Sequence, residues 1–208
     1  MPESRIELLG VPQSNFTRAV RITLEEKGVP YDLHPLIPHT PQVLAVHPWG
    51  KIPVLRKGDF SLCESRAIVG YLDRIYPEVP AIPADTPELA AQVDQWISIL
   101  STVVDTVLIR RYALSYRFPD GPGGSVDRDI IAAVVPDMRK ALQTLDVALA
   151  GKSVLVGNHF TFADALLMTM LEVTVTLPEG RALMEEMLNA TRYLKHHAER
   201  PSVAATRP

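Results

Sequence analysis

The chain has 208 residues, a length that allows one large domain or two small ones, each able to bury a core. Hydrophobic residues make up 47% of it and charged residues 22%, as in ordinary soluble globular proteins, so we do not expect disorder. The formal net charge of -3, without a basic block, excludes the electrostatic pattern of nucleic-acid and anionic-membrane binding.

The start of the chain and its single cysteine bear on the cellular compartment. Residues 1–7 lack the basic and then apolar pattern of a signal peptide, and no apolar run approaches the roughly 20 residues that span a bilayer. We therefore expect a cytoplasmic protein. Because Cys63 is the only cysteine, the chain has neither an intrachain disulfide nor a C-x-x-C redox pair.

The first part of the chain alternates between strand and helix patterns. Residues 6–9 predict a strand that ends in a turn, and apolar residues at helical spacing predict a helix over residues 16–27. Residues 29–33 predict a second strand. Thr40 followed by Pro41 predicts the cap and the first residue of a short helix.

The stretch from Trp49 to Ile68 predicts a strand, a tight turn, a second strand and the start of a helix. Pro53 lies in the first of these strands, where a proline is tolerated only at an edge, at a bulge or where the backbone is presented to a partner. Glu64 and Ser65 open the helix. Together with the preceding elements, this order predicts a small mixed sheet with helices on both faces.

A run of prolines then divides the chain. Four prolines fall within eleven residues, which no helix or central strand can contain: Pro77, Pro80, Pro83 and Pro87. We therefore predict an α/β domain over residues 1–77, a linker over residues 78–86 and an all-helical domain over residues 87–208.

Beyond the linker the apolar spacing is helical throughout. It predicts a long helix over residues 87–117 and a second helix over about residues 126–149. Thr161 and Asp164 have capping-box spacing ahead of an apolar helix that we expect at the centre of this domain. One or two short helices should follow before a tail at Arg200.

Three motifs in this order resemble the cytosolic glutathione transferases. They are G-x-P-x-S-x-x-T-R from Gly10 to Arg18, then I-P followed by E-S-R-A-I in the stretch described above, and T-F-A-D at residues 161–164. The first motif is similar to the serine-type classes, closest to the phi class or a related bacterial class. Each motif alone is weak, but their order and the change of domain point together to this family. The resemblance covers essentially the whole chain and implies a thioredoxin-like N-terminal domain followed by an all-α helical bundle.

The resemblance implies a glutathione site around Pro53 and Glu64. In the thioredoxin-like fold the Ile52-Pro53 bond is cis, so that the backbone of Ile52 can pair with an extended tripeptide as an added strand. Glu64 and Ser65, at a helix start, are suited to the ammonium and carboxylate groups of the γ-glutamyl end. The alternatives are a rigid or edge proline without a ligand, and a Ser65 that merely caps its helix.

Lys51 and His39 are candidates for the glycyl carboxylate at the other end of glutathione. Lys51 directly precedes the strand, and members of the family often carry Gln or Lys at this position. His39 is equally well explained as a solvated loop histidine. The six histidines show no close metal-ligand spacing, so we expect no metal.

Ser14 is the residue that we expect to carry the chemistry. The thiol of glutathione has a pKa of ~8.5 and is mostly protonated at neutral pH. A hydroxyl that donates to the sulfur at a helix N-terminus would lower this pKa, whereas the plain alternative is an N-cap serine. Asn15 is the adjacent alternative donor. Since no cysteine lies at this turn, disulfide reduction and deglutathionylation are disfavoured, and Cys63 is better explained as a buried small hydrophobe.

The second substrate is expected between the domains, against the first long helix of the helical domain. Five residues are candidates for the inner face of that helix: Ser98, Thr102, Arg110, Tyr112 and Tyr116. For each of them, packing in the core or exposure to solvent is the simpler explanation. The exposed face of the helix that carries Arg66 is similar to the dimer-contacting region of the family, which implies a homodimer.

We therefore predict a glutathione transferase that activates the thiol as a thiolate for attack on a small hydrophobic electrophile, in a detoxification role. Two other classes stay open. One is a glutathione- or ligand-binding protein of the same fold without efficient turnover, and the other is a structural partner domain. The sequence does not identify the electrophile, and it does not separate conjugation from peroxide reduction, isomerisation or dehalogenation.

Overall fold

A four-stranded sheet organises the first part of the chain in the computed structural model, which describes residues 5–83 and 85–208. Residues 1–4 and Ala84, which fall in the predicted first domain and linker, lie outside this description. In chain order the strands are β1 (Ile6–Leu9), β2 (Tyr31–His34), β3 (Val54–Lys57) and β4 (Phe60–Cys63). Across the sheet the order is β2-β1-β3-β4. Only the β1/β2 pair is parallel, so the predicted mixed sheet is confirmed.

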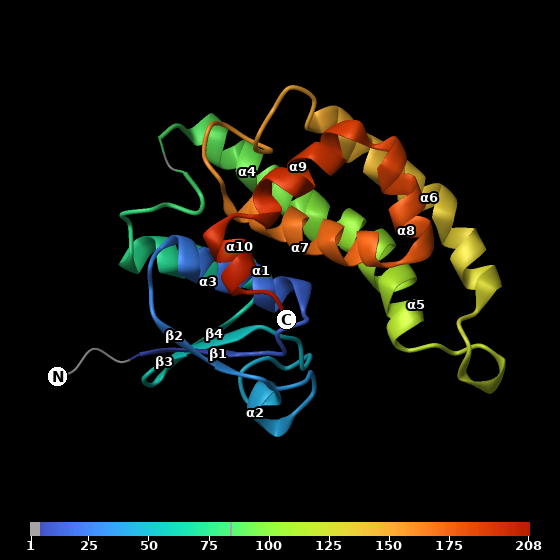
Figure 1. The fold of residues 1–208 in the computed structure, drawn as a ribbon. Coiled ribbons are helices and arrows are strands. Elements are labelled where there is room, and N and C mark those ends of the chain that lie inside the picture. The colour runs from blue at the N-terminus through green and yellow to red at the C-terminus, as the bar shows by residue number, and fades with distance from the viewer. Residues whose placement is uncertain (1–4, 84) are drawn as a thin grey trace.

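Helices cover both faces of this sheet (Figure 1). The three helices of this part are α1 (Asn15–Glu26), α2 (Pro41–Leu44) and α3 (Ser65–Ile75). Figure 1 shows α1 and α3 on the face toward the helical domain and α2 on the other face. Two of these helices begin at the residues that the sequence indicates. Ser14 is the N-cap of α1, and Thr40 and Pro41 are the N-cap and the first residue of α2.

The rest of the chain is helical, as predicted, and α3 ends well before α4 begins. Its elements are α4 (Pro87–Ile99), η1 (Leu100–Ala113), α5 (Leu114–Arg117), η2 (Pro122–Gly124), α6 (Arg128–Ala148), α7 (Phe162–Thr176), α8 (Pro178–Glu186), α9 (Leu188–Ala198) and α10 (Pro201–Ala205). The predicted long helix over residues 87–117 is the unbroken succession α4, η1 and α5, in which η1 is a π-helix. Within the described part of the chain, no helix has both the length and the hydropathy to cross a bilayer.

Helix α7 is the central helix of this domain, as the apolar pattern predicts. Its start carries the expected capping box, because Asp164 accepts from the Thr161 backbone and hydroxyl at 2.9 Å each. The Asp164 carboxylate also accepts from Leu155 N at 2.8 Å and from the Tyr193 hydroxyl at 2.9 Å. A carboxylate that is fully buried is therefore bonded on every side, which is the condition for burying it.

The end of the chain differs from the prediction. Helices α8 and α9 precede Arg200, but the expected tail folds as α10 and packs against α1. Pro201 occupies the first turn, where a missing N–H costs nothing, and Val203 is fully buried. The C-terminus thus returns to the N-terminal domain (Figure 1).

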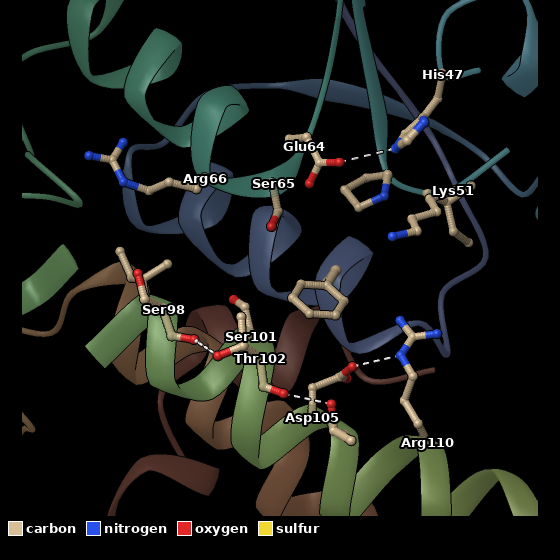
Figure 2. Close-up of a pocket in the computed structure, with 15 residues that line it drawn as sticks. His47, Lys51, Glu64, Ser65, Arg66, Ser98, Ser101, Thr102, Asp105 and Arg110 are labelled. Carbon is tan, nitrogen blue, oxygen red and sulfur yellow. Dashed lines mark hydrogen bonds and ion pairs between the residues drawn. The ribbon is translucent and has the colours of Figure 1, made fainter. Parts of the chain in front are cut away.

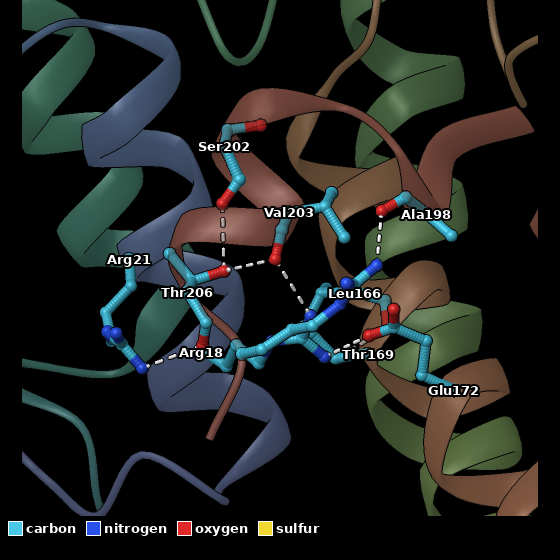
Figure 3. Close-up of polar contacts among 10 residues, drawn as sticks. Arg18, Arg21, Leu166, Thr169, Glu172, Ala198, Ser202, Val203 and Thr206 are labelled. Carbon is cyan, nitrogen blue, oxygen red and sulfur yellow. Dashed lines mark hydrogen bonds and ion pairs between the residues drawn. The ribbon is translucent and has the colours of Figure 1, made fainter.

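Two arginines of α1 hold the domains together (Figure 3). Arg18 forms an ion pair with Glu172 of α7 and donates to Val203 O at 3.2 Å. Arg21 donates to Thr206 O at 3.0 Å. Both arginines are almost completely buried, at 4% and 9% exposed. A buried cation is stable only when it is paired, so these contacts fix α1 between the sheet and the helical domain.

The buried pair of Arg18 and Glu172 should contribute to stability. Replacing Arg18 with Met should lower the free energy of unfolding by about 3 kcal/mol or more, because Glu172 would keep a largely buried and unpaired charge. The control is Arg111→Met, because Arg111 and Asp137 form an exposed pair whose loss should change stability by about 0–1 kcal/mol. Urea unfolding followed by circular dichroism measures both free energies of unfolding. Equal effects of the two substitutions would contradict a larger contribution of the buried pair.

Candidate functional site

A cavity of about 620 Å³ lies where the sheet domain meets α4 and η1 (Figure 2). The sheet domain contributes Phe16, His47, Lys51, Ile52, Pro53, Glu64, Ser65 and Arg66. The helical wall contributes Ile97, Ser98, Ser101, Thr102, Asp105, Thr106 and Arg110. The structure therefore brings most of the predicted site residues to one cavity between the two domains.

Ile52 and Pro53 form the floor of this cavity immediately before β3. The peptide bond between them is cis, as expected. Pro53 lies outside the hydrogen-bonded ladder, which begins at Val54, so a proline is compatible with a strand that has neighbours on both sides.

Glu64 and Ser65 face the cavity at the start of α3. Glu64 is the N-cap residue with φ 68°, a left-handed conformation that is costly for a residue with a side chain. Ser65 is the first helical residue and is 8% exposed, so it is not the cap of its helix. The first N–H groups of a helix have no partner within the helix. The wall at α3 thus offers a hydroxyl, backbone donors and a positive dipole end to an anion.

His47 also lines the cavity and contacts Glu64. Its Nδ1 accepts a hydrogen bond from Trp49 N at 3.3 Å, so Nε2 carries the proton and points at Glu64 Oε1, also at 3.3 Å. His47 is 3% exposed, whereas the Glu64 side chain is 67% exposed and keeps room for a ligand. Sequence reasoning missed His47, because only folding brings it to a residue that lies 17 positions further along the chain.

Lys51 and His39 differ in their relation to the cavity. Lys51 lines it, with no hydrogen bond or ion pair to the described part of the chain. His39 is exposed and does not line it. Its backbone N–H donates to Gly50 O at 2.8 Å, and its ring lies over Gly50, where a Cβ would come within 2.3 Å of the ring. His39 therefore packs on Gly50, the residue before Lys51, and does not line the cavity.

Ser14 and Asn15 lie at the start of α1, and neither lines the cavity, whereas Phe16 in the same turn does. The Ser14 hydroxyl oxygen accepts from Thr17 N at 3.3 Å, so Ser14 is an N-cap. A hydroxyl that accepts in this way still carries a proton that it can donate. Asn15 is 7% exposed. Capping and donation to a ligand are thus compatible at Ser14.

The predicted residues of the helical wall fall into two groups. Ser98, Thr102 and Arg110 line the cavity, but Tyr112 and Tyr116 do not. Both tyrosine hydroxyls donate to Glu179 of α8, at 3.1 Å and 2.6 Å. Tyr112 is fully buried, and burial raises the pKa of its hydroxyl. The structure therefore places Tyr112 of η1 and Tyr116 of α5 in the packing against α8, outside the cavity.

The π-helix η1 contributes further residues to the wall. Ser101, Asp105 and Thr106 line the cavity and were not predicted. In a π-helix the hydrogen bonds run to the fifth residue, so side chains four and five positions apart share a face. Ser101 and Asp105 lie three and seven positions after Ser98, a spacing that an α-helix also places on one face, so the helical period alone did not exclude them.

Asp105 and Arg110 show this spacing directly. The Arg110 Nε donates to Asp105 Oδ2 at 2.8 Å across five positions (Figure 2). Asp105 is 3% exposed, and burial raises the pKa of its carboxyl, while the bond to Arg110 and the charges of Arg110 and Lys51 act in the opposite direction. The charge of Lys51 on the sheet domain thus acts on a carboxyl of the helical wall, which places both at one end of the cavity.

Comparison with known proteins agrees with this architecture. Residues 8–80 match the family model described as "Glutathione S-transferase, N-terminal domain", and residues 108–201 match "Glutathione S-transferase, C-terminal domain". Glutathione S-transferase F10 of Arabidopsis thaliana is 32% identical over 171 residues, which cover 79% of this chain and 78% of that relative.

Solved structures share the whole fold. The crystal structure of glutathione transferase F7 from Populus trichocarpa has a TM-score of 0.83 and 25% identity, and the match covers 97% of each chain. Glutathione S-transferase-I bound with the ligand lactoylglutathione has a TM-score of 0.83 and 24% identity, with 98% of this chain and 99% of that chain covered. By its two matched domains, its relatives and its fold, this chain belongs to the glutathione S-transferase family and is a glutathione transferase.

Proposed function

We propose that the protein binds glutathione along the sheet-domain wall of the cavity and activates its thiol as a thiolate, which then attacks an electrophile held against α4 and η1. The observation that carries this proposal is the convergence of three features on one cavity. These are the first turn of α1, the Ile52-Pro53 segment and the start of α3. We retain as further proposals a homodimer, a cytoplasmic location, a detoxification role and domain boundaries at residues 77 and 87.

The tripeptide would lie extended between two charged ends. At the α3 end, the carboxylate of the γ-glutamyl group would accept from the Ser65 hydroxyl and the first backbone N–H groups, and Glu64 would pair with the ammonium group. At the other end, Lys51 would pair with the glycyl carboxylate, and His39 lies next to it. Between them, the backbone of Ile52 would pair with the cysteinyl backbone.

Ser14 would donate to the sulfur at the N-terminus of α1. Lowering the pKa of the thiol by about two units from ~8.5 requires roughly 2.7 kcal/mol of preferential stabilisation of the thiolate. One hydrogen bond to a charged group contributes about 1.5–3 kcal/mol, and a helix dipole about 0.3–1 kcal/mol. These two interactions are therefore sufficient. In the case of an aryl halide, the new S–C bond would form as halide leaves, and the thiol proton would pass to solvent.

Replacing Ser14 with Ala should lower kcat/KM for conjugation at neutral pH by about 20-fold, because the thiol would return toward its free pKa of ~8.5. Ser14→Asp is the matched variant, since it keeps an N-cap oxygen for Thr17 N but cannot donate to sulfur and repels a thiolate. It should lose activity while keeping the wild-type midpoint in urea unfolding. If Ser14→Ala kept the wild-type kcat/KM and Asn15→Ala lowered it instead, Asn15 and not Ser14 would be the donor.

Replacing Ser65 with Ala should raise the Kd for glutathione by about 10-fold to 100-fold. A hydrogen bond to a charged group contributes about 1.5–3 kcal/mol, and about 1.4 kcal/mol corresponds to tenfold in affinity. Stability should change little, because Glu64 and not Ser65 is the cap of α3. Isothermal titration calorimetry measures the Kd, with Ser115→Ala in α5, outside the cavity, as the control. An unchanged Kd in Ser65→Ala would refute this placement of the γ-glutamyl end.

A further inference from the structure

One end of the cavity carries more positive charge than the described protein groups neutralise. Lys51 from the sheet domain and Arg110 from the helical wall both line this end, and both charges act on the Asp105 carboxyl. Figure 2 shows the Lys51 and Arg110 side chains at the same end of the cavity. Two cations and one carboxylate leave one positive charge in excess.

Both cations have N–H groups that are available to bind a ligand. Lys51 has no hydrogen bond or ion pair with residues 5–83 and 85–208. Arg110 uses only its Nε, in the bond to Asp105, and within the described chain its two terminal nitrogens have no bonded partner. The Arg110 side chain is 55% exposed, so these nitrogens are accessible.

Asp105 fixes the direction in which Arg110 presents these nitrogens. The carboxylate is buried in η1 and accepts from Nε at 2.8 Å, so it holds the guanidinium by one edge. The remaining edge carries parallel N–H groups, whose spacing matches the two oxygens of a carboxylate. A guanidinium held in this way is preorganised to bind an anion.

We propose that Arg110 of the helical domain is a glutathione-binding residue. It binds the glycyl carboxylate from the side opposite Lys51. This inference rests on the proposed function, since it extends the same glutathione site across the domain interface. One ligand carboxylate neutralises the one excess charge. At the other end of the cavity, Glu64 and the α3 N-terminus match the ammonium and carboxylate of the γ-glutamyl group.

The proposal makes the glycyl carboxylate a determinant of specificity. Glutathione should bind more tightly than its glycine amide, in which the carboxylate is replaced by a neutral group of similar size. Arg110→Gln should lower the affinity for glutathione about 10-fold and leave the affinity for the amide unchanged. The glutamine can still donate to Asp105, so this substitution does not leave the buried carboxylate unpaired.

The test is a cycle of two ligands and three proteins, measured by isothermal titration calorimetry. The proteins are wild type, Arg110→Gln and the control Arg139→Gln, which removes an exposed arginine of the same domain that pairs with Glu186 outside the cavity. The expected result is that only Arg110→Gln reduces the discrimination between glutathione and the amide. Equal losses for both ligands, or no loss for glutathione, would overturn the inference while leaving glutathione binding itself established.

A second experiment tests whether Arg110 binds the glycyl carboxylate of glutathione or a carboxylate on the second substrate. Conjugation of 4-chloro-3,5-dinitrobenzoate is compared with that of its methyl ester in wild type and Arg110→Gln. The inference predicts that the substitution affects the two electrophiles equally. A loss confined to the carboxylate-bearing electrophile would overturn the inference and assign Arg110 to the second substrate. If wild type binds no glutathione, the proposed function itself fails, and that result is distinct from both outcomes.

Discussion

The position of α1 is the constraint on which the candidate site depends. Ser14 caps its N-terminus, Phe16 of its first turn lines the cavity, and its buried arginines bond to groups from α7 and from the end of the chain. Since these cations lie in the protein interior, they require their partners. A shift of α1 relative to the helical domain would break several buried polar contacts at once. The geometry between the cap of α1 and the wall formed by α4 and η1 is therefore defined by folding.

The cavity itself is polarised from end to end. At α3 it has a helix N-terminus, the Glu64 carboxylate on a left-handed backbone, and the buried His47 in contact with that carboxylate. At the opposite end it has Lys51 and Arg110, and Arg110 is bonded to Asp105. The costly backbone conformation of Glu64 directs its side chain to a place where it pairs with His47 and stays accessible. This distribution of charge favours an extended zwitterion that carries a second carboxylate at its far end, as glutathione does.

Local sequence signals predicted most of the fold. The caps at Ser14, Thr40 and Thr161 and the proline run each act within a few residues, so they can be recognised without the structure. The mixed sheet and the change to an all-helical domain follow from periodicity. The tail at Arg200 was mispredicted because α10 is short and is held by α1, from which nearly the whole chain separates it.

The site was predicted less completely, and for a physical reason. Ser65 and Lys51 were found because they adjoin helix and strand ends that the sequence reveals. His47 was missed because its role depends on a contact across the fold. Asp105 was missed, and Tyr112 was included, because helical spacing alone does not say which face of the helix lines the cavity, and the bond of Tyr112 to Glu179 of α8 forms only in the fold.

The proposed function requires the glutathione thiol to be ionised in the site at neutral pH. The most direct measurement is the ultraviolet absorbance of the thiolate in the complex of wild-type protein with glutathione, followed as the pH is changed. We expect the bound thiol to titrate at a pKa of about 6.5, roughly two units below the ~8.5 of a free thiol, so that the absorbance is largely developed at neutral pH. A complex in which glutathione is bound but its thiol titrates at about 8.5 would contradict thiolate activation.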